Sequence, residues 1–238
     1  MAGRDRQLAV LVAAMVFPTV ASWLYFLTFA DREWMRQLYF GSKLVQAALP
    51  LLGWGLAGLP RDRLRRAPAA GWLAGAASGV LLAAGIGLAY LLFAGTTLEE
   101  VARAPIRARL EAFAATSTTG FLALAVALSL AHSLFEEYYW RWFLFGSLRR
   151  RLPRAAAVTV AAAAFATHHV VILHAFLGPR YLLAATLPFS AAVALGGVLW
   201  CLLYDRWRSL AAPWLSHALV DGAIMAVAWA LVLRPGGP

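Results

Sequence analysis

Long apolar stretches alternate along the chain with short, arginine-rich breaks. Each stretch runs for about twenty residues or more, the length that a helix needs to cross the ~30 Å hydrocarbon core of a bilayer. Lipid offers the backbone no hydrogen-bonding partner, so helix is the expected state of every stretch. The alternating pattern of a membrane β-barrel is absent. We therefore predict an all-α, polytopic membrane helix bundle of about seven transmembrane helices, at roughly residues 8–30, 38–58, 71–95, 117–147, 155–177, 181–204 and 209–233.

Composition supports the same class. Hydrophobic residues make up 62% of the 238 residues, and mean hydropathy is +0.71, as is typical of membrane proteins. The net charge of +10 suggests nucleic acid as a partner. However, the arginines sit in short runs at the span ends and form no continuous basic face, so we expect no nucleic-acid partner. Cys201 is the only cysteine, which excludes an internal disulfide and a cysteine-rich metal site.

Charges between the spans predict the orientation of the protein. Lys and Arg accumulate on the cytoplasmic side of a membrane, and arginine runs mark every second loop, which makes the N-terminus cytoplasmic. One lysine against 20 arginines indicates a GC-rich genome, so we expect a bacterial inner (plasma) membrane. The runs are Arg4 and Arg6, then Arg61, Arg63, Arg65 and Arg66, then Arg149, Arg150, Arg151 and Arg154, then Arg206 and Arg208.

We divide the chain into two parts. Residues 1–115 supply the N-terminal transmembrane helices and a connecting segment, and residues 116–238 form a transmembrane core. The connecting segment, Thr97–Phe113, mixes apolar and charged residues. It is expected to be either an interfacial amphipathic helix broken near Pro105 or a solvated loop. Three glycines form a small-residue face suited to close helix contact: Gly71, Gly75 and Gly79.

Ionisable side chains inside the predicted spans are the least expected feature of the sequence. Burying such a group in lipid is costly, so each one is a functional-site hypothesis, although a single one can also serve helix assembly. Nine together weaken that second explanation. They are His132, Glu136, Glu137, Arg141, His168, His169, His174, His217 and Asp221.

Four of these residues are expected at similar depth in the membrane. Counted from the nearest cytoplasmic arginine at about 1.5 Å per residue, Glu136 and Asp221 lie roughly 20 Å deep, His169 about 22 Å and His217 near 14 Å. Three helices therefore bring acid and imidazole groups closer to the bilayer interior than to its surfaces. We expect them to meet in one cavity.

Helical spacing adds detail to this arrangement. His217 and Asp221 are four residues apart and share a helix face, as do Glu137 and Arg141. Glu136 points about 100° away from Glu137, so one carboxylate can engage Arg141 while the other faces a different neighbour. For three further histidines packing is the alternative to a catalytic role: His132, which is within helical reach of the first glutamate, His168 and His174.

Three motifs in succession resemble those of the CAAX protease and bacteriocin-processing (CPBP) family of intramembrane endopeptidases, which is related to the CAAX prenyl endoproteases. EExxxR is Glu136–Arg141, FxxxH is Phe165–His169, and the variant of HxxxN is His217–Asp221. EExxxR alone would be weak, but the three occur in order on successive apolar helices. By this resemblance, residues 116–238 form the catalytic core.

The resemblance implies a role for each motif. Glu136 and His169 would activate a water molecule for attack on a peptide carbonyl, with Glu136 as the general base. His217 and the residue at position 221 would stabilise the oxyanion. Such a mechanism needs no nucleophilic side chain. Two residues would support this set as an ion pair that holds the helix geometry: Glu137 and Arg141.

Asp221 departs from the most familiar family pattern, which has Asn at this position. An Asn amide donates a hydrogen bond, whereas an ionised Asp only accepts. Direct oxyanion binding by Asp221 therefore requires a protonated carboxyl. Alternatively, Asp221 accepts an N–H of His217 and orients the imidazole, which is then the only donor of the pair. We favour the orienting role.

Metal dependence is an alternative for the same residues. Two histidines and a carboxylate also form a zinc ligand set, and the family has been described both ways. The HExxH signature is missing, and Arg141 places positive charge near the glutamates. We expect a metal-independent glutamate mechanism with no cofactor, with zinc as the alternative.

The expected function is hydrolysis of a peptide bond in a membrane-associated peptide or in the C-terminal tail of a protein within the lipid bilayer. A proton-coupled transporter is a second hypothesis, because glutamate and histidine can relay protons, but the sequence shows no inverted repeats. A non-catalytic scaffold or immunity protein is a third, in which EExxxR only joins helices. The complete set of three motifs argues against it.

Overall fold

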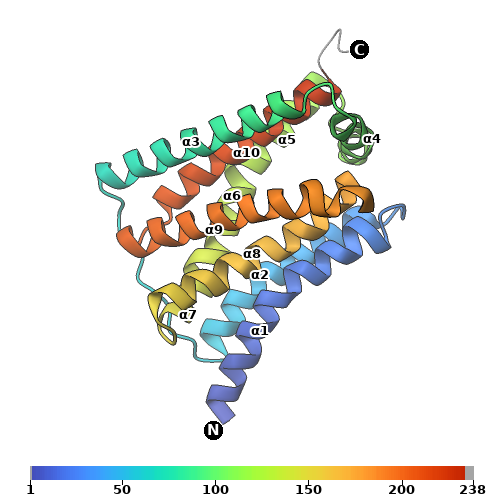
Figure 1. Cartoon of the computed structure of the whole chain (residues 1–238). Helices are drawn as coiled ribbons and strands as arrows, with labels where there is room; N and C mark the ends of the chain where they lie inside the picture. Colours follow the sequence, from blue (N-terminus) through green and yellow to red (C-terminus); the bar gives the residue numbers. More distant parts are fainter. Residues whose placement is uncertain (1, 234–238) are drawn as a thin grey trace.

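The computed structural model describes residues 2–233, and every regular element in that range is helical, which confirms the all-α class. Short π-helical and 3-10 turns join several of the α-helices. Figure 1 labels the α-helices, which are α1 (Ala2–Trp23), α2 (Met35–Gly55), α3 (Ala69–Phe93), α4 (Thr97–Ala112), α5 (Thr118–Val126), α6 (Ser133–Glu137), α7 (Gly146–Arg149), α8 (Arg154–Leu177), α9 (Leu187–Trp207) and α10 (Ala211–Val232).

Within residues 2–233, six helical segments are long and apolar enough to cross a membrane, which confirms a multi-pass membrane protein and is close to the predicted seven. The remaining predicted span, 38–58, corresponds to α2. Its 21 residues include Lys43 and the buried Gln46, so it is less apolar than the others. The six segments are Gly3–Thr28, Ala69–Phe93, Thr118–Arg149, Arg154–Leu177, Pro179–Trp207 and Ala211–Val232.

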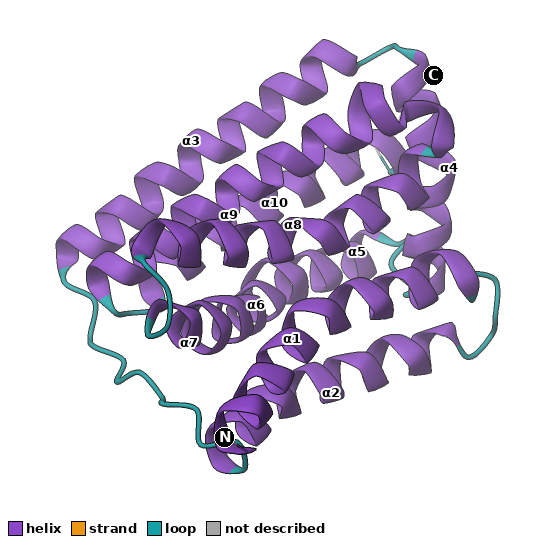
Figure 2. Ribbon diagram, turned by 60° about the horizontal axis from the view of Figure 1, so that its bottom comes forward, coloured by secondary structure: helices purple, strands orange, loops and turns teal. Residues whose placement is uncertain are grey.

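Helices that are distant in the sequence lie side by side. In Figures 1 and 2, α3 runs along α10, while α8 lies between α1 and α9. Glycine permits the closest of these approaches. A Cβ atom on Gly75 would lie 2.5 Å from the carbonyl oxygen of Ala212, and one on Gly79 would lie 2.9 Å from Cα of Ser216. The small-residue face of α3 therefore fixes the position of α10, as its spacing predicts.

The connecting segment forms a helix, α4, which continues through Pro105 without the predicted break. Its amphipathic pattern explains why it packs on the bundle: Leu98 and Leu110 are buried, while most charged residues remain outside. Arg103 and Arg107 donate hydrogen bonds to backbone carbonyls in the last turn of α10. These bonds satisfy carbonyls that a helix end leaves unpaired.

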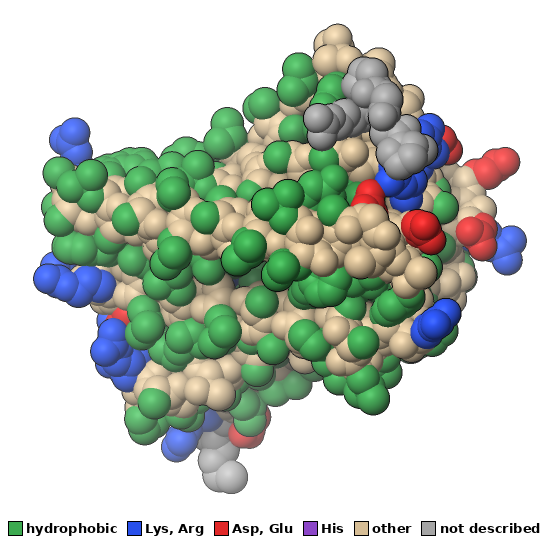
Figure 3. Space-filling model, turned by 45° about the horizontal axis from the view of Figure 1, so that its top comes forward, with side chains coloured by type: hydrophobic (Ala, Val, Ile, Leu, Met, Phe, Trp, Pro, Cys, Tyr) green, Lys and Arg blue, Asp and Glu red, His purple; other side chains and the backbone are tan. Residues whose placement is uncertain are grey.

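The face of the bundle shown in Figure 3 exposes many hydrophobic side chains, and charged residues gather toward its two ends. Leu44, Leu81 and Leu183 are more than 70% exposed, at 72%, 73% and 77%. Conversely, the buried residues include Glu136, Glu137 and other polar groups. Apolar outside and partly polar inside is the distribution expected when lipid, rather than water, surrounds the protein.

Candidate active site

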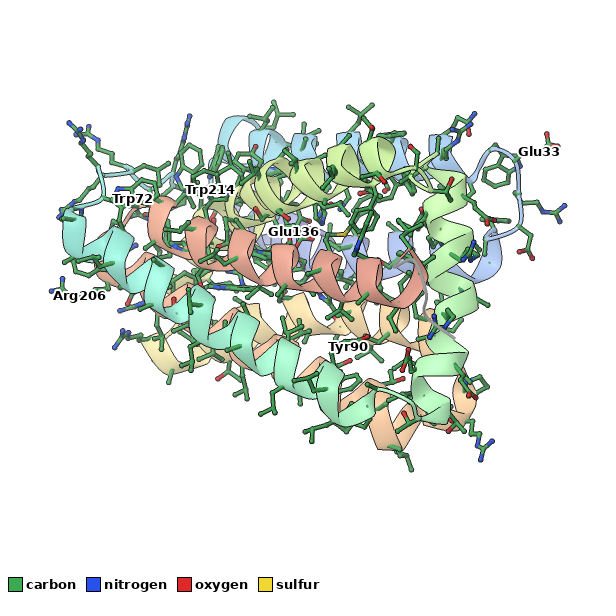
Figure 4. The ribbon with its side chains drawn as sticks, turned by 90° about the horizontal axis from the view of Figure 1, so that it is seen from above. Glu33, Trp72, Tyr90, Glu136, Arg206 and Trp214 are labelled. Atoms are coloured by element: carbon green, nitrogen blue, oxygen red, sulfur yellow. The ribbon has the colours of Figure 1, made fainter. Side chains whose placement is uncertain are left out.

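Two glutamates occupy the centre of the helical segment Thr118–Arg149. Glu136 and Glu137 are 3% and 0% exposed, and they end α6 between two π-helical stretches, Ala127–His132 and Tyr138–Phe145. Such insertions are frequent at functional sites, because the extra residue turns neighbouring side chains to new directions. Figure 4 shows Glu136 inside the bundle, near the middle of α10.

Glu136 faces three imidazoles. Its Oε1 lies 3.5 Å from Nε2 of His132 and 3.7 Å from Nε2 of His168. Its Oε2 lies 3.8 Å from Nε2 of His217. The three histidines come from the same segment as Glu136, from α8 and from α10, respectively. Sequence-distant ionisable groups therefore meet at one place inside the bundle.

Glu137 points in a different direction from Glu136 and contacts two basic side chains, His217 and Arg141. Its Oε1 accepts a hydrogen bond from Nδ1 of His217 at 2.8 Å and lies 3.2 Å from Nη1 of Arg141. Aromatic rings fix both partners: the His217 ring stacks on Trp200 at 4.0 Å, and the Arg141 guanidinium lies 4.6 Å from the ring centre of Phe165. The two adjacent carboxylates thus share His217, each through a different ring nitrogen, and their other neighbours differ, as the 100° offset along the helix predicts.

Asp221 shares a face with His217 but does not take the orienting position expected from the sequence. Its Oδ1 lies 3.6 Å from Nε2 of His217, beyond hydrogen-bonding distance. Glu137 makes that hydrogen bond instead, through the other ring nitrogen. The sequence separation of four residues predicts that Asp221 is near His217, but it cannot show that a carboxylate from another helix comes closer.

His169 lies beside this group, in a different position from His168. Its Nδ1 pairs with the carbonyl oxygen of Phe165 at 3.1 Å, which leaves Nε2 available to a ligand or a water molecule. His168 instead stacks on Trp140, with an angle of 3° between the rings, and reaches Glu136. The phenylalanine of FxxxH therefore orients one histidine through its backbone and contacts both through its ring.

Three residues near Glu136 are absent from the predicted catalytic set. Two of them can be recognised from their spacing to the motif residues: His132 is four residues before Glu136, and His168 is adjacent to His169. Lys43 is the third. Its Nζ lies 5.6 Å from the ring centre of Phe135, the residue before Glu136. Lys43 lies inside the predicted span 38–58. Since a charged residue inside a span is a functional-site candidate by default, its position in the sequence was also a signal.

A divalent metal ion is compatible with one subset of these side chains. Glu136, His168 and His169 each offer one ligand atom, and these atoms lie within 4.8 Å of one another. Two imidazoles and a carboxylate suit zinc, and the backbone carbonyl of Phe165 orients His169 as metal-binding histidines usually require. A zinc ion held there would polarise a peptide carbonyl and activate water.

Comparison with known proteins agrees with the motifs. The family model described as "Type II CAAX prenyl endopeptidase Rce1-like" matches residues 117–223. The matched segment contains both glutamates, the histidines of α8 and the pair on α10. No curated protein and no solved structure matches the chain. Over residues 117–223, this membrane protein is therefore similar to the Rce1-like type II CAAX prenyl endopeptidases, a family of proteases.

Proposed function

We propose that this protein is an intramembrane endopeptidase of the glutamic type, in which Glu136 activates a water molecule for attack on a peptide bond. The observation that supports this most is the position of Glu136, buried and within 3.8 Å of His132, His168 and His217. A general base must lie within hydrogen-bond reach of the water molecule that it deprotonates, and the surrounding ring nitrogens can hold such a water molecule beside the carboxylate. If Glu136 only joined two helices or filled space in the core, it would not need three imidazoles around its carboxylate.

The chemistry divides among the groups as follows. Glu136 accepts a proton from water as the water oxygen bonds to the peptide carbonyl carbon, and His169, through its free Nε2, holds the water. The carbonyl oxygen becomes an oxyanion. When the C–N bond breaks, the proton on Glu136 passes to the departing amine. The products are a carboxylic acid and an amine, with the water molecule consumed.

His217 is the proposed oxyanion donor. Glu137 accepts its Nδ1–H, which directs Nε2 toward Glu136 and Asp221. In the doubly protonated form, the Nε2–H group can donate to the oxyanion, and preorganised donors of this kind contribute much of the catalysis of acyl transfer. Asp221 adds an acceptor beside that nitrogen, and Arg141 holds Glu137 from behind.

We propose that the reaction needs no metal, although Glu136, His168 and His169 form a suitable donor set. His132 lies 3.5 Å from the same carboxylate, and the Lys43 ammonium lies 5.6 Å from the ring centre of the adjacent Phe135. A metal ion would therefore lie near the positive charge of Lys43, and Glu136 would be divided between acting as ligand and as base. The zinc alternative predicts loss of cleavage after exhaustive chelation and recovery with added zinc. The proposed mechanism predicts unchanged cleavage.

The proposed substrate is a membrane-associated peptide or the C-terminal tail of a protein that reaches the bilayer interior, in a bacterial inner membrane and with the N-terminus cytoplasmic. Comparing membrane proteomes of cells that carry the unchanged protein or Glu136→Gln tests the proposal. One or a few uncleaved precursors should accumulate with Glu136→Gln but not with Glu111→Gln, which makes the same change at an exposed position. Identical proteomes in all three strains would contradict a protease function.

A further inference from the structure

A second concentration of charge lies at the end of the bundle that carries the loops α2–α3, α7–α8 and α9–α10. These loops enclose a cavity of about 520 Å³. Its volume falls within the range of roughly 300–1,000 Å³ that is usual for ligand pockets. The lining residues are Asp62, Arg63, Leu64, Arg65, Arg149, Arg150 and Arg208.

Asp62 holds several of the residues around this cavity in place. It is buried, and its carboxylate binds Arg150 at 2.6 Å and Arg208 at 2.8 Å. Tyr204 donates a hydrogen bond to the same carboxylate at 3.1 Å, and Trp142 donates one to the Asp62 backbone carbonyl at 2.9 Å. The loop between α2 and α3 is thereby attached to two other helices. Two guanidinium groups are held in place before any ligand binds.

Arg208 has a side chain at a backbone position that usually favours glycine. It follows the last residue of α9 with a φ of 51°, a left-handed conformation that helix ends usually assign to glycine. An arginine there gives up some backbone stability, and its guanidinium bridges Asp62 and Asp205, the latter at 3.1 Å. Arg149 lies 3.6 Å from Asp205 as well. The carboxylates thus order the arginines around the cavity.

The cavity nevertheless has a large excess of positive charge. Five guanidinium groups and one carboxylate line it, an excess of four positive charges. In the described part of the chain, no carboxylate lies within 4.0 Å of Arg63 or Arg65, and both are exposed. Guanidinium groups bind phosphate oxygens in bidentate geometry. Phosphate is therefore the ligand chemistry that the cavity fits.

We propose that this cavity binds the phosphate group of an anionic membrane lipid. Its location supports the lipid source: the spans Thr118–Arg149 and Pro179–Trp207 end here, and Arg154–Leu177 and Ala211–Val232 begin here, so the cavity opens where lipid headgroups lie. Anionic lipids give the cytoplasmic leaflet a negative surface potential that attracts basic segments. The bound headgroup tethers the three loops that close this end of the catalytic core.

The test uses the full-length protein in detergent, titrated separately with phosphatidylglycerol, phosphatidylcholine and inorganic phosphate while the thermal unfolding midpoint is recorded. Phosphatidylglycerol should raise the midpoint of the unchanged protein. The double variant Arg63→Gln/Arg65→Gln should need roughly thirty-fold more of this lipid for half the effect. Because neither side chain makes an ion pair, its midpoint without lipid should be unchanged.

The matched control is Arg32→Gln/Arg36→Gln, which removes the same charge from exposed positions at the other end of α1 and α2. It should respond to phosphatidylglycerol like the unchanged protein. Equal weakening in both double variants would overturn the site, because it would show a general effect of net charge. Equal effects of phosphatidylcholine or of inorganic phosphate at the same concentration would overturn the assignment to an anionic lipid.

Discussion

The buried pair Glu137–Arg141 offers the sharpest test of how the centre of the helix bundle is held together. The two residues are 0% and 1% exposed, with 3.2 Å between Oε1 and Nη1. Arg141→Leu would keep much of the side-chain volume but leave Glu137 as a buried carboxylate whose one remaining close partner is His217. Breaking a buried pair in this way typically costs about 3–5 kcal/mol. The contacts of the guanidinium with Phe165 and Trp200 would also be lost.

A matched substitution elsewhere separates this effect from the loss of an arginine as such. The side chain of Arg154 is 56% exposed and pairs with Asp205 at 2.9 Å. Arg154→Leu should therefore cost only about 0–1 kcal/mol, as exposed ion pairs do. Thermal unfolding of both variants in the same detergent measures the difference. A loss below about 1 kcal/mol for Arg141→Leu, or equal losses for the two variants, would refute the reasoning.

The double variant Glu137→Gln/Arg141→Leu extends the same test. Because it removes the unpaired charge together with its partner, it should be more stable than Arg141→Leu alone, with a coupling of about 0.5–3 kcal/mol between the two sites. Strict additivity in the double-mutant cycle would show that the pair does not act as a unit. Cleavage should nevertheless stay low in the double variant, since the Gln oxygen can still accept from Nδ1 of His217 but carries no negative charge to stabilise the doubly protonated imidazole.

Further outcomes follow from single contacts. Asp221→Asn should retain kcat/KM within about tenfold, because Glu137 orients His217 and an Asn amide can itself donate to an oxyanion. A loss of kcat/KM above about a hundredfold would show that the carboxylate of Asp221 is needed. Gly75→Val should lower the unfolding midpoint, since a Cβ there would lie 2.5 Å from the Ala212 carbonyl oxygen, at a cost of about 1–3 kcal/mol. Gly85→Ala, whose Cβ would meet no atom within 4 Å, should leave the unfolding midpoint unchanged or raise it slightly. Equal shifts of the midpoint at Gly75 and Gly85 would contradict close contact of α3 and α10.

The sequence predicted the helical class, the membrane spans and the motifs because these depend on local properties. Span length follows from the apolar runs, and the pairs four residues apart follow from helical geometry. The different directions of the Glu136 and Glu137 side chains could also be predicted, since adjacent residues on a helix point about 100° apart. The small-residue pattern predicted close helix contact at Gly75 and Gly79, but it did not predict that α10 is the partner.

The contacts that could not be predicted from the sequence depend on how the helices pack against one another. His168 reaches Glu136 although the motif spacing pointed to His169, because both side chains face the core from one turn of α8. Glu137 replaces Asp221 as the partner of His217, since side-chain distances between helices cannot be counted along the sequence. The π-helical stretches around α6 also left no periodic signal. Asp62 lies in a loop with four arginines, and only the fold shows that its side chain is buried among arginines from three loops.

The central claim is that Glu136 acts as a general base without a metal. The most direct measurement is cleavage of an accumulated precursor by the purified protein before and after exhaustive chelation, beside the variants Glu136→Gln and Glu111→Gln. We predict unchanged cleavage after chelation, a loss of about a hundredfold to ten-thousandfold for Glu136→Gln, and no loss for Glu111→Gln. Cleavage by Glu136→Gln within tenfold of the unchanged protein, or activity lost on chelation and restored by zinc, would contradict the claim.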